Sequence, residues 1–445
     1  MSAQPLATAL GLDDVVAWLP DGPRRVRDLI ADARALAAHL PPGRHLLNVC
    51  QDRYRFAVGF TAGLLSGRVS LQPASQSAET LARLTNEFPD LIALRDASFD
   101  AGSLPVIDYP ALTDADPTTV SALPAFPEAQ LAAILFTSGS TGLPQPHRKH
   151  WGKLVRNGAA EAHRLGLVPQ GHSIVGTVPV QHSYGFESTF LLALHGGCPF
   201  WSGKPFFPQD IAAALAAVPA PRLLVTTPFH LANLMAAEVT LPPLAMILSA
   251  TAPLSHDLAD AVERRHGAPL FEIYGATESG QLASRRTTEG DTWTVLEGVK
   301  LVPNGDETVA QGGHVEVPVR LGDRIEFQSA DRFVLLGREA DLINLAGKRT
   351  SLAYLNHQIG AIPGVRDAAF FLPADEGPAM TRLCAFVVAP GLDANDLQAA
   401  LRQRLDPIFL PRPLVLVDAL PRNATGKLPR QALEALYADK VDRDR

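Results

Sequence analysis

The sequence predicts an α/β fold, with a large N-terminal domain of layered α/β subdomains, a small β-barrel-like part and a small α/β C-terminal domain. At 445 residues the chain has about three times the length of a typical domain. Hydrophobic residues make up 47% of it and charged residues 19%, which is enough apolar material for large buried cores. Helical and strand-like patterns alternate over the first 340 residues, as they do in parallel sheets covered by helices.

The alternation starts with a helix expected at residues 25–40, a strand at 45–49 and a helix at 54–65. Further strands are expected at residues 131–137, 173–178, 222–227, 246–249 and 270–273. Each of these is followed by Gly, Pro, Ser or Thr and then by a helical pattern. Ligand sites in such sheets lie where the strands end, so the residues after these runs are the first candidates for function.

The pattern changes after residue 315, where polar and apolar residues alternate as far as residue 336. This alternation predicts an antiparallel ribbon or the edge of a barrel, and therefore a different subdomain. A compact tail follows, with helices expected at 352–361, 394–405 and 428–438 and strands at 368–372, 383–388 and 414–417. We therefore expect two domains, residues 1–339 and 340–445.

Charge and cysteine content exclude several classes of protein. The 39 basic and 46 acidic residues give a net charge of −7, which disfavours nucleic acid or an anionic membrane as a partner bound through a basic surface. Cys50, Cys198 and Cys384 lack the spacing of a zinc site and are expected to be buried thiols in a reducing cytoplasm. No secretory signal and no run of about 18 apolar residues is visible, so we expect a soluble cytoplasmic protein without stable membrane insertion.

The first candidate site is a Ser/Thr/Gly loop directly after the strand expected at 131–137. Glycines let a backbone approach an anion closely, and successive N–H groups and hydroxyls can bind phosphate oxygens. An ordinary surface loop is the alternative, but a Walker loop is excluded because no Gly-Lys-Ser/Thr follows the glycines. The residues of the loop are Thr137, Ser138, Gly139, Ser140, Thr141 and Gly142.

Four further segments carry groups suited to nucleotide chemistry. Tyr274 in the run 274–278 could stack on a base, and Glu278 is a hard oxygen ligand suited to Mg²⁺. Asp323 could accept hydrogen bonds from ribose hydroxyls. Taken alone, these residues are more often a core tyrosine, a solvated glutamate and a turn-forming aspartate. The last two segments are residues 337–349 and 420–430, which contain Arg338, Ala340, Gly347, Arg349 and Lys427.

In this order the five segments resemble the signature motifs of the adenylate-forming superfamily, which comprises acyl-CoA synthetases, adenylation domains of peptide synthetases and luciferases. The resemblance covers nearly the whole chain, from about residue 26 to about residue 436. It implies that ATP and Mg²⁺ convert a carboxylic acid into an acyl-adenylate with release of pyrophosphate. It also implies that the C-terminal domain is a mobile lid, which rotates so that a thiol can attack.

The resemblance implies roles for the matched residues. Lys427, Glu278 and Thr277 would be catalytic, with Glu278 also binding Mg²⁺, and Gly347 and Ala340 would mark the pantetheine tunnel and the hinge. The implied ATP-binding residues are Thr137, Ser138, Gly139, Ser140, Thr141, Gly142, Tyr274, Gly275, Thr277, Asp323, Arg338, Arg349 and Lys427. Two positions depart from the superfamily pattern. Gln145 replaces a lysine of the loop, which leaves Lys149 or His147 as substitutes, and Ala340 replaces an Asp or Lys at the hinge.

Residues 179–187 fall where members of the superfamily line the acyl pocket. No aspartate precedes Glu187 there to pair with an ammonium group, so an α-amino acid is disfavoured as substrate. Flat side chains opposite small ones predict a planar aromatic acid with a polar para group, although the His and Tyr could instead be core residues. The expected acid-binding residues are His182, Tyr184, Gly185, Phe186, Ala250, Thr251, Tyr274 and Gly275.

The short chain and this pocket are most similar to AMP-ligases of aryl-polyene and xanthomonadin-type pigment pathways. That similarity implies 4-hydroxybenzoate or a related aryl acid as substrate and an acyl carrier protein as acceptor. Two alternatives stay open. One is an acyl- or aryl-CoA ligase that uses free coenzyme A, and the other is a non-catalytic scaffold that binds a nucleotide or an acyl group.

Overall fold

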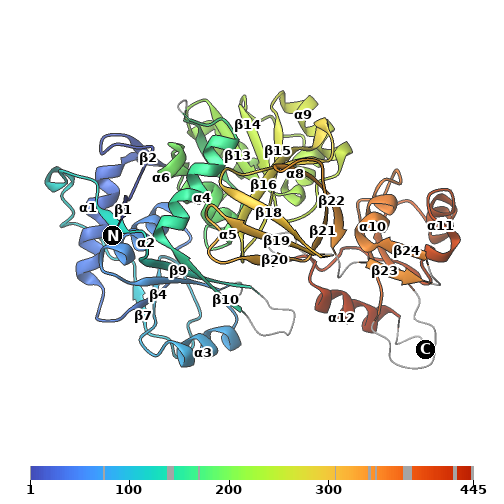
Figure 1. Cartoon of the computed structure of the whole chain (residues 1–445), viewed down its shortest axis with the longest axis horizontal. Helices are drawn as coiled ribbons and strands as arrows, with labels where there is room; N and C mark the ends of the chain where they lie inside the picture. Colours follow the sequence, from blue (N-terminus) through green and yellow to red (C-terminus); the bar gives the residue numbers. More distant parts are fainter. Residues whose placement is uncertain are drawn as a thin grey trace. The chain divides into compact units, whose positions relative to one another are not determined.

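The computed structural model describes residues 2–73, 76–137, 145–168, 171–305, 307–338, 342–345, 348–373, 383–423 and 428–441. The chain divides into two compact units (Figure 1). Unit 1 comprises Met1–Val302, Val309–Val319 and Ser329–Arg332, and unit 2 comprises Pro303–Thr308, Arg320–Gln328 and Phe333–Arg445. The boundary expected between residues 339 and 340 lies outside the described residues and stays a prediction.

The first sheet of unit 1 has six strands in the order β10-β9-β5-β4-β6-β7. Its strands are parallel except for β10, which pairs antiparallel with β9. The strands are β4 (His45–Asn48), β5 (Val69–Gln72), β6 (Ile92–Arg95), β7 (Val106–Asp108), β9 (Leu131–Thr137) and β10 (Gln145–His150). The helices near it are α1 (Val26–His39), α2 (Arg53–Leu65) and α3 (Ala78–Glu87).

The second sheet of unit 1 runs in the order β17-β16-β15-β14-β13-β11-β12-β2-β3. Its six strands from β15 to β2 are parallel. The strands are β2 (Val15–Leu19), β3 (Gly22–Arg25), β11 (Ser173–Gly176), β12 (Phe200–Trp201), β13 (Arg222–Thr226), β14 (Met246–Ser249), β15 (Leu270–Ala276), β16 (Gly280–Arg286) and β17 (Thr292–Val295). The helices α4 (Trp151–Arg164), α7 (Pro208–Ala217), α8 (Pro228–Ala236) and α9 (His256–His266) accompany it.

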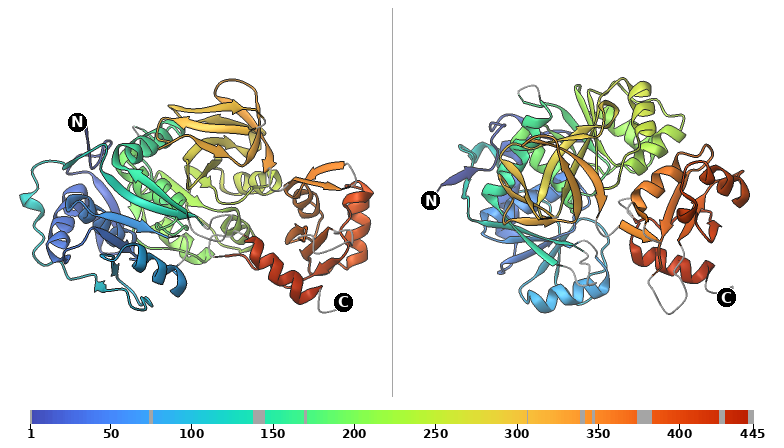
Figure 2. Two further views of the ribbon diagram at one scale, coloured as in Figure 1. Left: turned by 60° about the horizontal axis from the view of Figure 1, so that its bottom comes forward. Right: turned by 45° about the vertical axis from the view of Figure 1, so that its right-hand side comes forward.

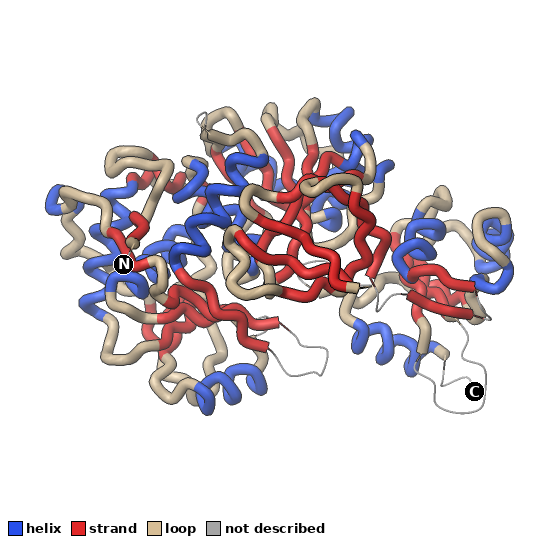
Figure 3. Tube along the Cα trace, in the orientation of Figure 1, coloured by secondary structure: helices blue, strands red, loops and turns tan. Residues whose placement is uncertain are grey.

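The two sheets are stacked in layers with helices between and outside them (Figure 3). Successive residues of a strand face opposite sides, so Ala133 and Leu135 join the central core while Ile134 and Phe136 face the core under α3. The second sheet divides in the same way, with its outer face packed on α7, α8 and α9. The predicted α/β class, with buried parallel strands covered by helices, is therefore confirmed.

The central core contains a helical segment in three parts: α5 (Ser183–Gly185), the π-helix η2 (Phe186–Leu191) and α6 (Leu192–Gly196). Every residue of η2 is buried. The hydroxyl of Thr189 donates to the carbonyl of Gly185. The rings of Phe186 and Phe190 each lie 5.2 Å from the ring of Phe60 on α2, measured between centroids. Edge and tilted contacts of this kind stabilise an apolar core, so η2 is anchored by its aromatic side chains.

Short strands complete the chain up to residue 338. β1 (Ala3–Pro5) pairs with β8 (Ala125–Pro127). β18 (Val299–Asn304), β19 (Glu307–Gly312) and β20 (Val319–Leu321) form a small sheet, drawn in yellow to orange in Figure 2. β21 (Asp323–Phe327) and β22 (Arg332–Arg338) form an antiparallel hairpin, which confirms the ribbon predicted after residue 315.

The C-terminal part of unit 2 is a small α/β fold of its own. Its elements are β23 (Leu342–Leu345), β24 (Lys348–Ser351), α10 (Leu352–Gly360), β25 (Asp367–Phe371), β26 (Cys384–Val388), α11 (Ala394–Arg402), β27 (Leu414–Leu416) and α12 (Arg430–Lys440). The sheet β25-β26-β27 has a core on each face. One core packs under α10 and α11 and the other under α12, as the alternation of buried residues in β26 requires.

The structure also bears on the cysteines and on the length of the helices. All three cysteines are buried and none forms a disulfide, as predicted. Among the described helices, none combines the length and the apolar character that a bilayer span requires.

Candidate active site

The sequence-predicted site residues of unit 1 gather where the parallel strands of the second sheet end. His182 and Thr251 lie in the segments that follow the carboxyl ends of β11 and β14, and residues 274–278 include the carboxyl end of β15 and the start of the turn after it. These ends lie on one edge of the sheet, because the strands are parallel neighbours or next neighbours. This is the edge at which sheets of this type bind ligands.

Residues 274–278 form the end of β15 and the turn into β16. The pairing of β15 with β16 shifts between Tyr274 and Gly275, an irregularity that bends the strand just before the turn. A side chain at Gly275 would place its Cβ 2.4 Å from the carbonyl oxygen of Gly280, so the turn requires glycine there. Gly275 and Ala276 are exposed, whereas Tyr274, Thr277 and Glu278 are half-buried. The motif therefore presents accessible backbone flanked by polar side chains.

Tyr274 and Thr277 are each held by a neighbour. The Tyr274 ring lies 5.7 Å from the ring of Trp293 on β17, measured between centroids. The hydroxyl oxygens of Thr277 and Ser183 lie 3.3 Å apart, although 94 residues separate them in the sequence. This contact joins the 274–278 turn to the start of α5.

The Ser/Thr/Gly loop leaves the sheet at Thr137 on β9 and returns at Gln145 on β10. Thr137 Oγ1 and His147 Nε2 are hydrogen-bonded at 3.1 Å. Burial lowers the pKa of His147, an effect increased by the nearby Lys149 charge and opposed by Glu278. The loop residues Ser138, Gly139, Ser140, Thr141 and Gly142 lie outside the described residues.

Lys149 on β10 contacts the turn that contains Glu278. Its Nζ donates a hydrogen bond of 3.3 Å to the backbone carbonyl of Glu278, and its side chain is buried. Gln145, at the start of β10, is exposed. Of the two substitutes considered for the missing loop lysine, Lys149 therefore points into the protein, whereas His147 contacts Thr137 at the end of β9.

The expected acid-binding residues fall into two groups. His182 and Thr251 are half-buried at the sheet edge, and Ala250 is 8% exposed. Tyr184 and Phe186 belong to the central core instead. The Tyr184 hydroxyl donates to the carbonyl oxygen of Leu248, and Phe186 is fully buried, so neither side chain forms an accessible pocket wall.

Gly185 and Thr251 have unusual local geometry. A Cβ at Gly185 would lie 2.1 Å from the carbonyl oxygen of Pro179, so the chain approaches itself too closely for any side chain. Thr251 has a φ of 80°, the one positive value among the non-glycine residues that the structure describes. A β-branched residue in this region is strained, and strain of this kind is concentrated at functional sites.

In unit 2, Asp323 and Arg338 occupy opposite positions of the β21–β22 hairpin. Two residues 15 positions apart in the sequence are thus cross-strand neighbours, as a shared role at one ligand would require. Arg349 lies on β24. Ala340, Gly347 and Lys427 lie outside the described residues.

A buried polar network lies behind the sheet edge. Ser188 donates to Glu161 at 2.6 Å, and the Gln281 amide donates to Ser188 at 2.7 Å. Burial raises the pKa of Glu161 to about 8. Burial also raises the pKa of Glu187 to about 7, and this shift is opposed by the Lys149 charge and a hydrogen bond from Asn157. Sequence reasoning missed Glu161, Asn157 and His314, since isolated polar residues in helical or loop patterns give no signal of burial.

The residues present fit Mg²⁺ brought in with a nucleotide. No group of three metal-binding side chains occurs in the described part of the chain. The half-buried Glu278 carboxylate has no side-chain hydrogen bond or ion pair with any described residue. Mg²⁺ in nucleotide enzymes is held by one or two carboxylates together with substrate phosphates, so a single accessible carboxylate suits it.

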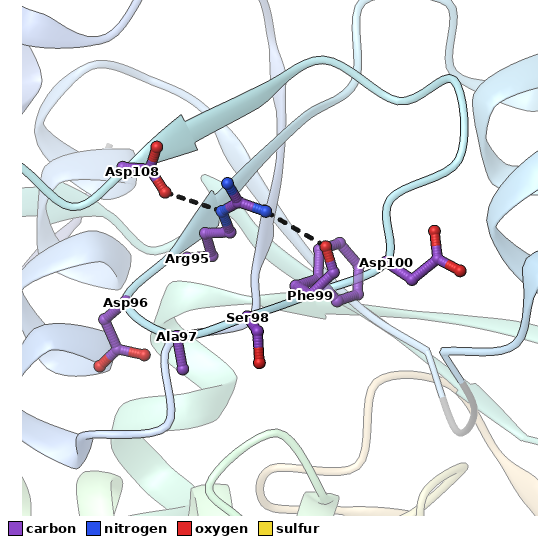
Figure 4. Close-up of a pocket in the computed structure, with 7 residues that line it drawn as sticks. All are labelled: Arg95, Asp96, Ala97, Ser98, Phe99, Asp100 and Asp108. Carbon is purple, nitrogen blue, oxygen red and sulfur yellow. Dashed lines mark hydrogen bonds and ion pairs between the residues drawn. The ribbon is translucent and has the colours of Figure 1, made fainter.

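A separate pocket of about 630 Å³ lies after β6 and is lined by polar and charged side chains together with Ala97 and Phe99 (Figure 4). Arg95 donates to Asp108 at 2.7 Å and to the carbonyl of Phe99 at 3.2 Å. Asp96 accepts hydrogen bonds from the backbone of Gln51 and Asp52. These partners account for the charged groups structurally, and the pocket is not part of the candidate site.

Two parts of the chain match models of the same enzyme family. Residues 44–312 match the AMP-binding enzyme family, and residues 356–427 match the AMP-binding enzyme C-terminal domain. A 4-coumarate–CoA ligase from Rhodobacter capsulatus is 32% identical over 300 residues, which are 66% of this chain and 74% of the relative. An L-proline–[L-prolyl-carrier protein] ligase from Streptomyces coelicolor is 23% identical, with 95% of this chain and 87% of the relative covered.

Solved structures show the same fold. The o-succinylbenzoate CoA synthetase of Bacillus subtilis, in complex with its acyl-adenylate intermediate, superposes with a TM-score of 0.81. The match covers 98% of this chain and 99% of that chain at 20% identity. The MatB protein of Rhodopseudomonas palustris with bound ATP also gives a TM-score of 0.81, with 96% of each chain covered and 20% identity.

Proposed function

Because the chain belongs to the AMP-binding enzyme family, we propose that it joins an aryl carboxylic acid to the phosphopantetheine thiol of an acyl carrier protein. The broader activity follows from the family and the relatives. The protein is an AMP-forming acid–thiol ligase, which uses ATP to activate a carboxylic acid as an acyl-adenylate and then forms a thioester. The preferred acid in this proposal is 4-hydroxybenzoate or a close analogue.

One observation carries the proposal: three segments distant in sequence meet at the carboxyl edge of the second sheet. Lys149 and His147 come from the strand after the Ser/Thr/Gly loop, Ser183 from the start of α5, and Thr277 and Glu278 from the turn after β15. The loop suits a triphosphate, the start of α5 suits the acid, and the turn suits the α-phosphate with its metal ion. Adenylation requires these three ligands side by side.

In the first step of the proposed mechanism, a carboxylate oxygen of the acid attacks the α-phosphorus of ATP. The bond from that phosphorus to the bridging oxygen breaks, and pyrophosphate leaves. Both reactants are anions, so the protein must place positive charge and hydrogen-bond donors where their repulsion is greatest. We assign this role to the Lys427 ammonium and the Thr277 hydroxyl. A bound Mg²⁺ would supply further positive charge to the phosphate oxygens.

In the second step the thiol sulfur attacks the acyl carbon of the adenylate. The acyl C–O bond breaks, AMP leaves with the electron pair, and the thiol proton passes to solvent. Asp323 and Arg338 would hold the ribose, and Gly347 would leave room for the pantetheine arm. Orientation of two bound reactants contributes about 7–11 kcal/mol to reactions of this type, so positioning groups are as important as charges.

The accessible residues at the acid end favour an aryl acid. Glu187 is 4% exposed and faces Lys149 and Asn157, so it is not available to pair with the ammonium group of an amino acid. His182 offers a flat polar side chain after β11, and Ala250 and Thr251 follow β14, two strands away in the same sheet. A ring with a polar para group suits this combination. The relatives support an aromatic substrate as well, because several of them are 4-coumarate–CoA ligases.

The acceptor separates this proposal from its main alternative. The relatives include ligases named for coenzyme A and one named for a carrier protein. An aryl-CoA ligase is therefore the second candidate function. Thioester formation from the same acid, measured with coenzyme A and with a holo acyl carrier protein, distinguishes the two.

The first experiment is acid-dependent ATP–pyrophosphate exchange with 4-hydroxybenzoate, benzoate, cinnamate, octanoate and phenylalanine. Exchange confined to the aryl acids is the expected result. Exchange with phenylalanine alone would contradict the aryl-acid proposal, and no exchange with any acid would contradict adenylation. Glu278→Gln should lower exchange about 100-fold because the metal loses its carboxylate, whereas Glu297→Gln on the surface is the matched control.

A further inference from the structure

Lys149 lies in a buried cluster that joins the segments proposed to bind ATP and the acid. We call Lys149, Asn157, Glu187, Glu278 and His314 the Lys149 cluster. Lys149 comes from β10, Asn157 from α4 and Glu187 from the π-helix η2. Glu278 belongs to the turn between β15 and β16, and His314 to the segment after β19. All five residues belong to unit 1.

The direction of the Lys149 side chain follows from the strand. Neighbouring residues of β10 face opposite sides, and Arg148 is exposed while Lys149 is 5% exposed. His147 and Lys149 therefore share the face that looks toward Glu278. From there the Lys149 ammonium donates to the Glu278 carbonyl at 3.3 Å.

The cluster surrounds a cavity of about 10 Å³, which Lys149, Asn157, Glu187, Gly280 and His314 help to line. His314 donates from Nε2 to the carbonyl of Gln281 at 2.5 Å, so its Nδ1 is an acceptor. Neither this Nδ1 nor the Oδ1 of Asn157 has a hydrogen-bond partner among the described residues. Two acceptors and a buried carboxylate thus surround one cavity, and such groups require a donor or a cation close by.

Lys149 is the buried lysine at this cavity whose charge acts on Glu187, although it donates to neither of the two acceptors. The second lysine at the cavity, Lys153, donates to the carbonyls of Gly313 and Val315 at 2.8 and 2.9 Å. Among the residues that the structure describes, Lys149 makes one such contact, to the Glu278 carbonyl, and an ammonium group carries three N–H donors. The Lys149 charge opposes the rise in the pKa of Glu187 that burial causes, so loss of that charge would disfavour the Glu187 carboxylate further.

We propose that Lys149 is a positioning residue that fixes the Glu278 turn against β10 and η2, and that it does not bind the phosphates of ATP. The proposal rests on the proposed function, because Glu278 matters only if ATP and its metal ion bind at this edge. It also distinguishes the roles of Lys149 and His147, the two candidates to replace the lysine that is missing at position 145. Lys149 is turned away from solvent into the cluster, so any cationic help for the triphosphate comes from elsewhere.

The test uses Lys149→Met, Glu187→Gln and the double variant of the full-length protein. Lys149→Met should unfold at a lower temperature than the wild type, because Glu187 loses its facing cation. The double variant should recover part of that loss, since glutamine carries no charge. If Lys149→Met does not fold, recovery of folding in the double variant tests the same pairing. An additive loss in the double variant would overturn the pairing.

Calorimetric titration of ATP without acid distinguishes positioning from phosphate binding. With EDTA present, the double variant should bind ATP within about threefold of the wild type. With Mg²⁺ present, the gain in affinity should be about tenfold smaller than in the wild type, because the Glu278 turn is no longer held. A loss of about tenfold or more with EDTA would overturn the proposal and make Lys149 a phosphate ligand.

Lys153→Met is the matched control, since it removes a second ammonium from the same cavity. It should lower the unfolding temperature without changing the Mg²⁺-dependent gain in ATP affinity. An equal change in that gain would mean that any damage to the cavity disturbs the site, and would overturn a specific role for Lys149. Failure of the wild type to bind ATP at all would instead contradict the proposed function, and the unfolding measurements would still test the Lys149–Glu187 pairing.

Discussion

The hydroxyl of Tyr184 donates a hydrogen bond of 2.9 Å to the carbonyl oxygen of Leu248, at the end of β14. The ring is buried in the central core, and burial raises the pKa of the hydroxyl well above its usual value. Tyr184 therefore joins α5 to the strand that precedes Thr251. Its polar group is used inside the protein and is not offered to a substrate.

We expect Tyr184→Phe to lower the free energy of unfolding by about 1 kcal/mol, because the Leu248 carbonyl loses its donor. Urea unfolding measures this loss. The KM for the aryl acid should stay within about twofold of the wild-type value, since the hydroxyl does not reach the pocket. A large rise in KM with no change in stability would contradict this placement of Tyr184.

Thr251→Gly should relieve the backbone strain at a positive φ. We expect the free energy of unfolding to rise by about 0.5–1 kcal/mol, the balance between the relief of strain and the greater freedom of glycine in the unfolded chain. The KM for the aryl acid should rise, because the pocket loses a side chain. Thr251→Ala is the control, since it removes the hydroxyl and keeps the strained Cβ. Equal stability of the two variants would show that the positive φ carries no strain.

The buried carboxyl of Glu161 should make stability depend on pH. Burial raises its pKa from the usual 4.5 to about 8, so in this interval the unfolded chain releases a proton that the folded protein keeps. The free energy of unfolding should therefore fall as pH rises, by about 1.4 kcal/mol per pH unit from this group alone. Glu161→Gln removes the titration and keeps the shape.

Urea unfolding of the wild type and Glu161→Gln between pH 5 and pH 8 isolates this effect, because all other titrating groups are common to both proteins. The wild type should lose stability relative to the variant as pH rises. Parallel profiles would mean that Glu161 is ionised in the folded protein across the whole interval.

Lys427→Ala should lower acid-dependent ATP–pyrophosphate exchange by about 100- to 1,000-fold, because the adenylation transition state loses its cation. Transfer to the thiol from supplied acyl-adenylate should be retained, since that step begins after the two anions have reacted. Lys440→Ala on α12 is the control. Retained exchange in the Lys427 variant would contradict the role that the superfamily resemblance implies.

Local patterns in the sequence predicted much of the fold. The strands at 131–137 and 246–249 match β9 and β14 to the residue, because buried parallel strands leave short apolar runs bounded by turn residues. The order of strands in each sheet could not be predicted, since it depends on contacts between distant segments. The π-helix η2 could not be predicted either, because its hydrogen-bond spacing is decided by packing in the core.

Parts of the candidate site could be predicted from the sequence and other parts could not. The motifs at Thr137 and at residues 274–278 were identified from residue type and from their place after a strand. The burial of Phe186 was not predicted, and a core position for Tyr184 was only the alternative, since an aromatic residue near a histidine has the same sequence pattern in a pocket wall and in a core. The Lys149 cluster joins residues from 149 to 314, and no local pattern marks such a set.

Two successive polar residues of the π-helix η2 both contact helix α4. Ser188 contacts Glu161 and Glu187 faces Asn157, and these two partners are one turn apart on α4. An ordinary α-helix would rotate adjacent side chains further apart, so both could not meet the same helix so directly. The insertion or loss of a single amino acid in this segment would rotate the following side chains about the helix axis. Every sequence motif would remain, but Ser188 and Glu187 would no longer contact their partners on α4.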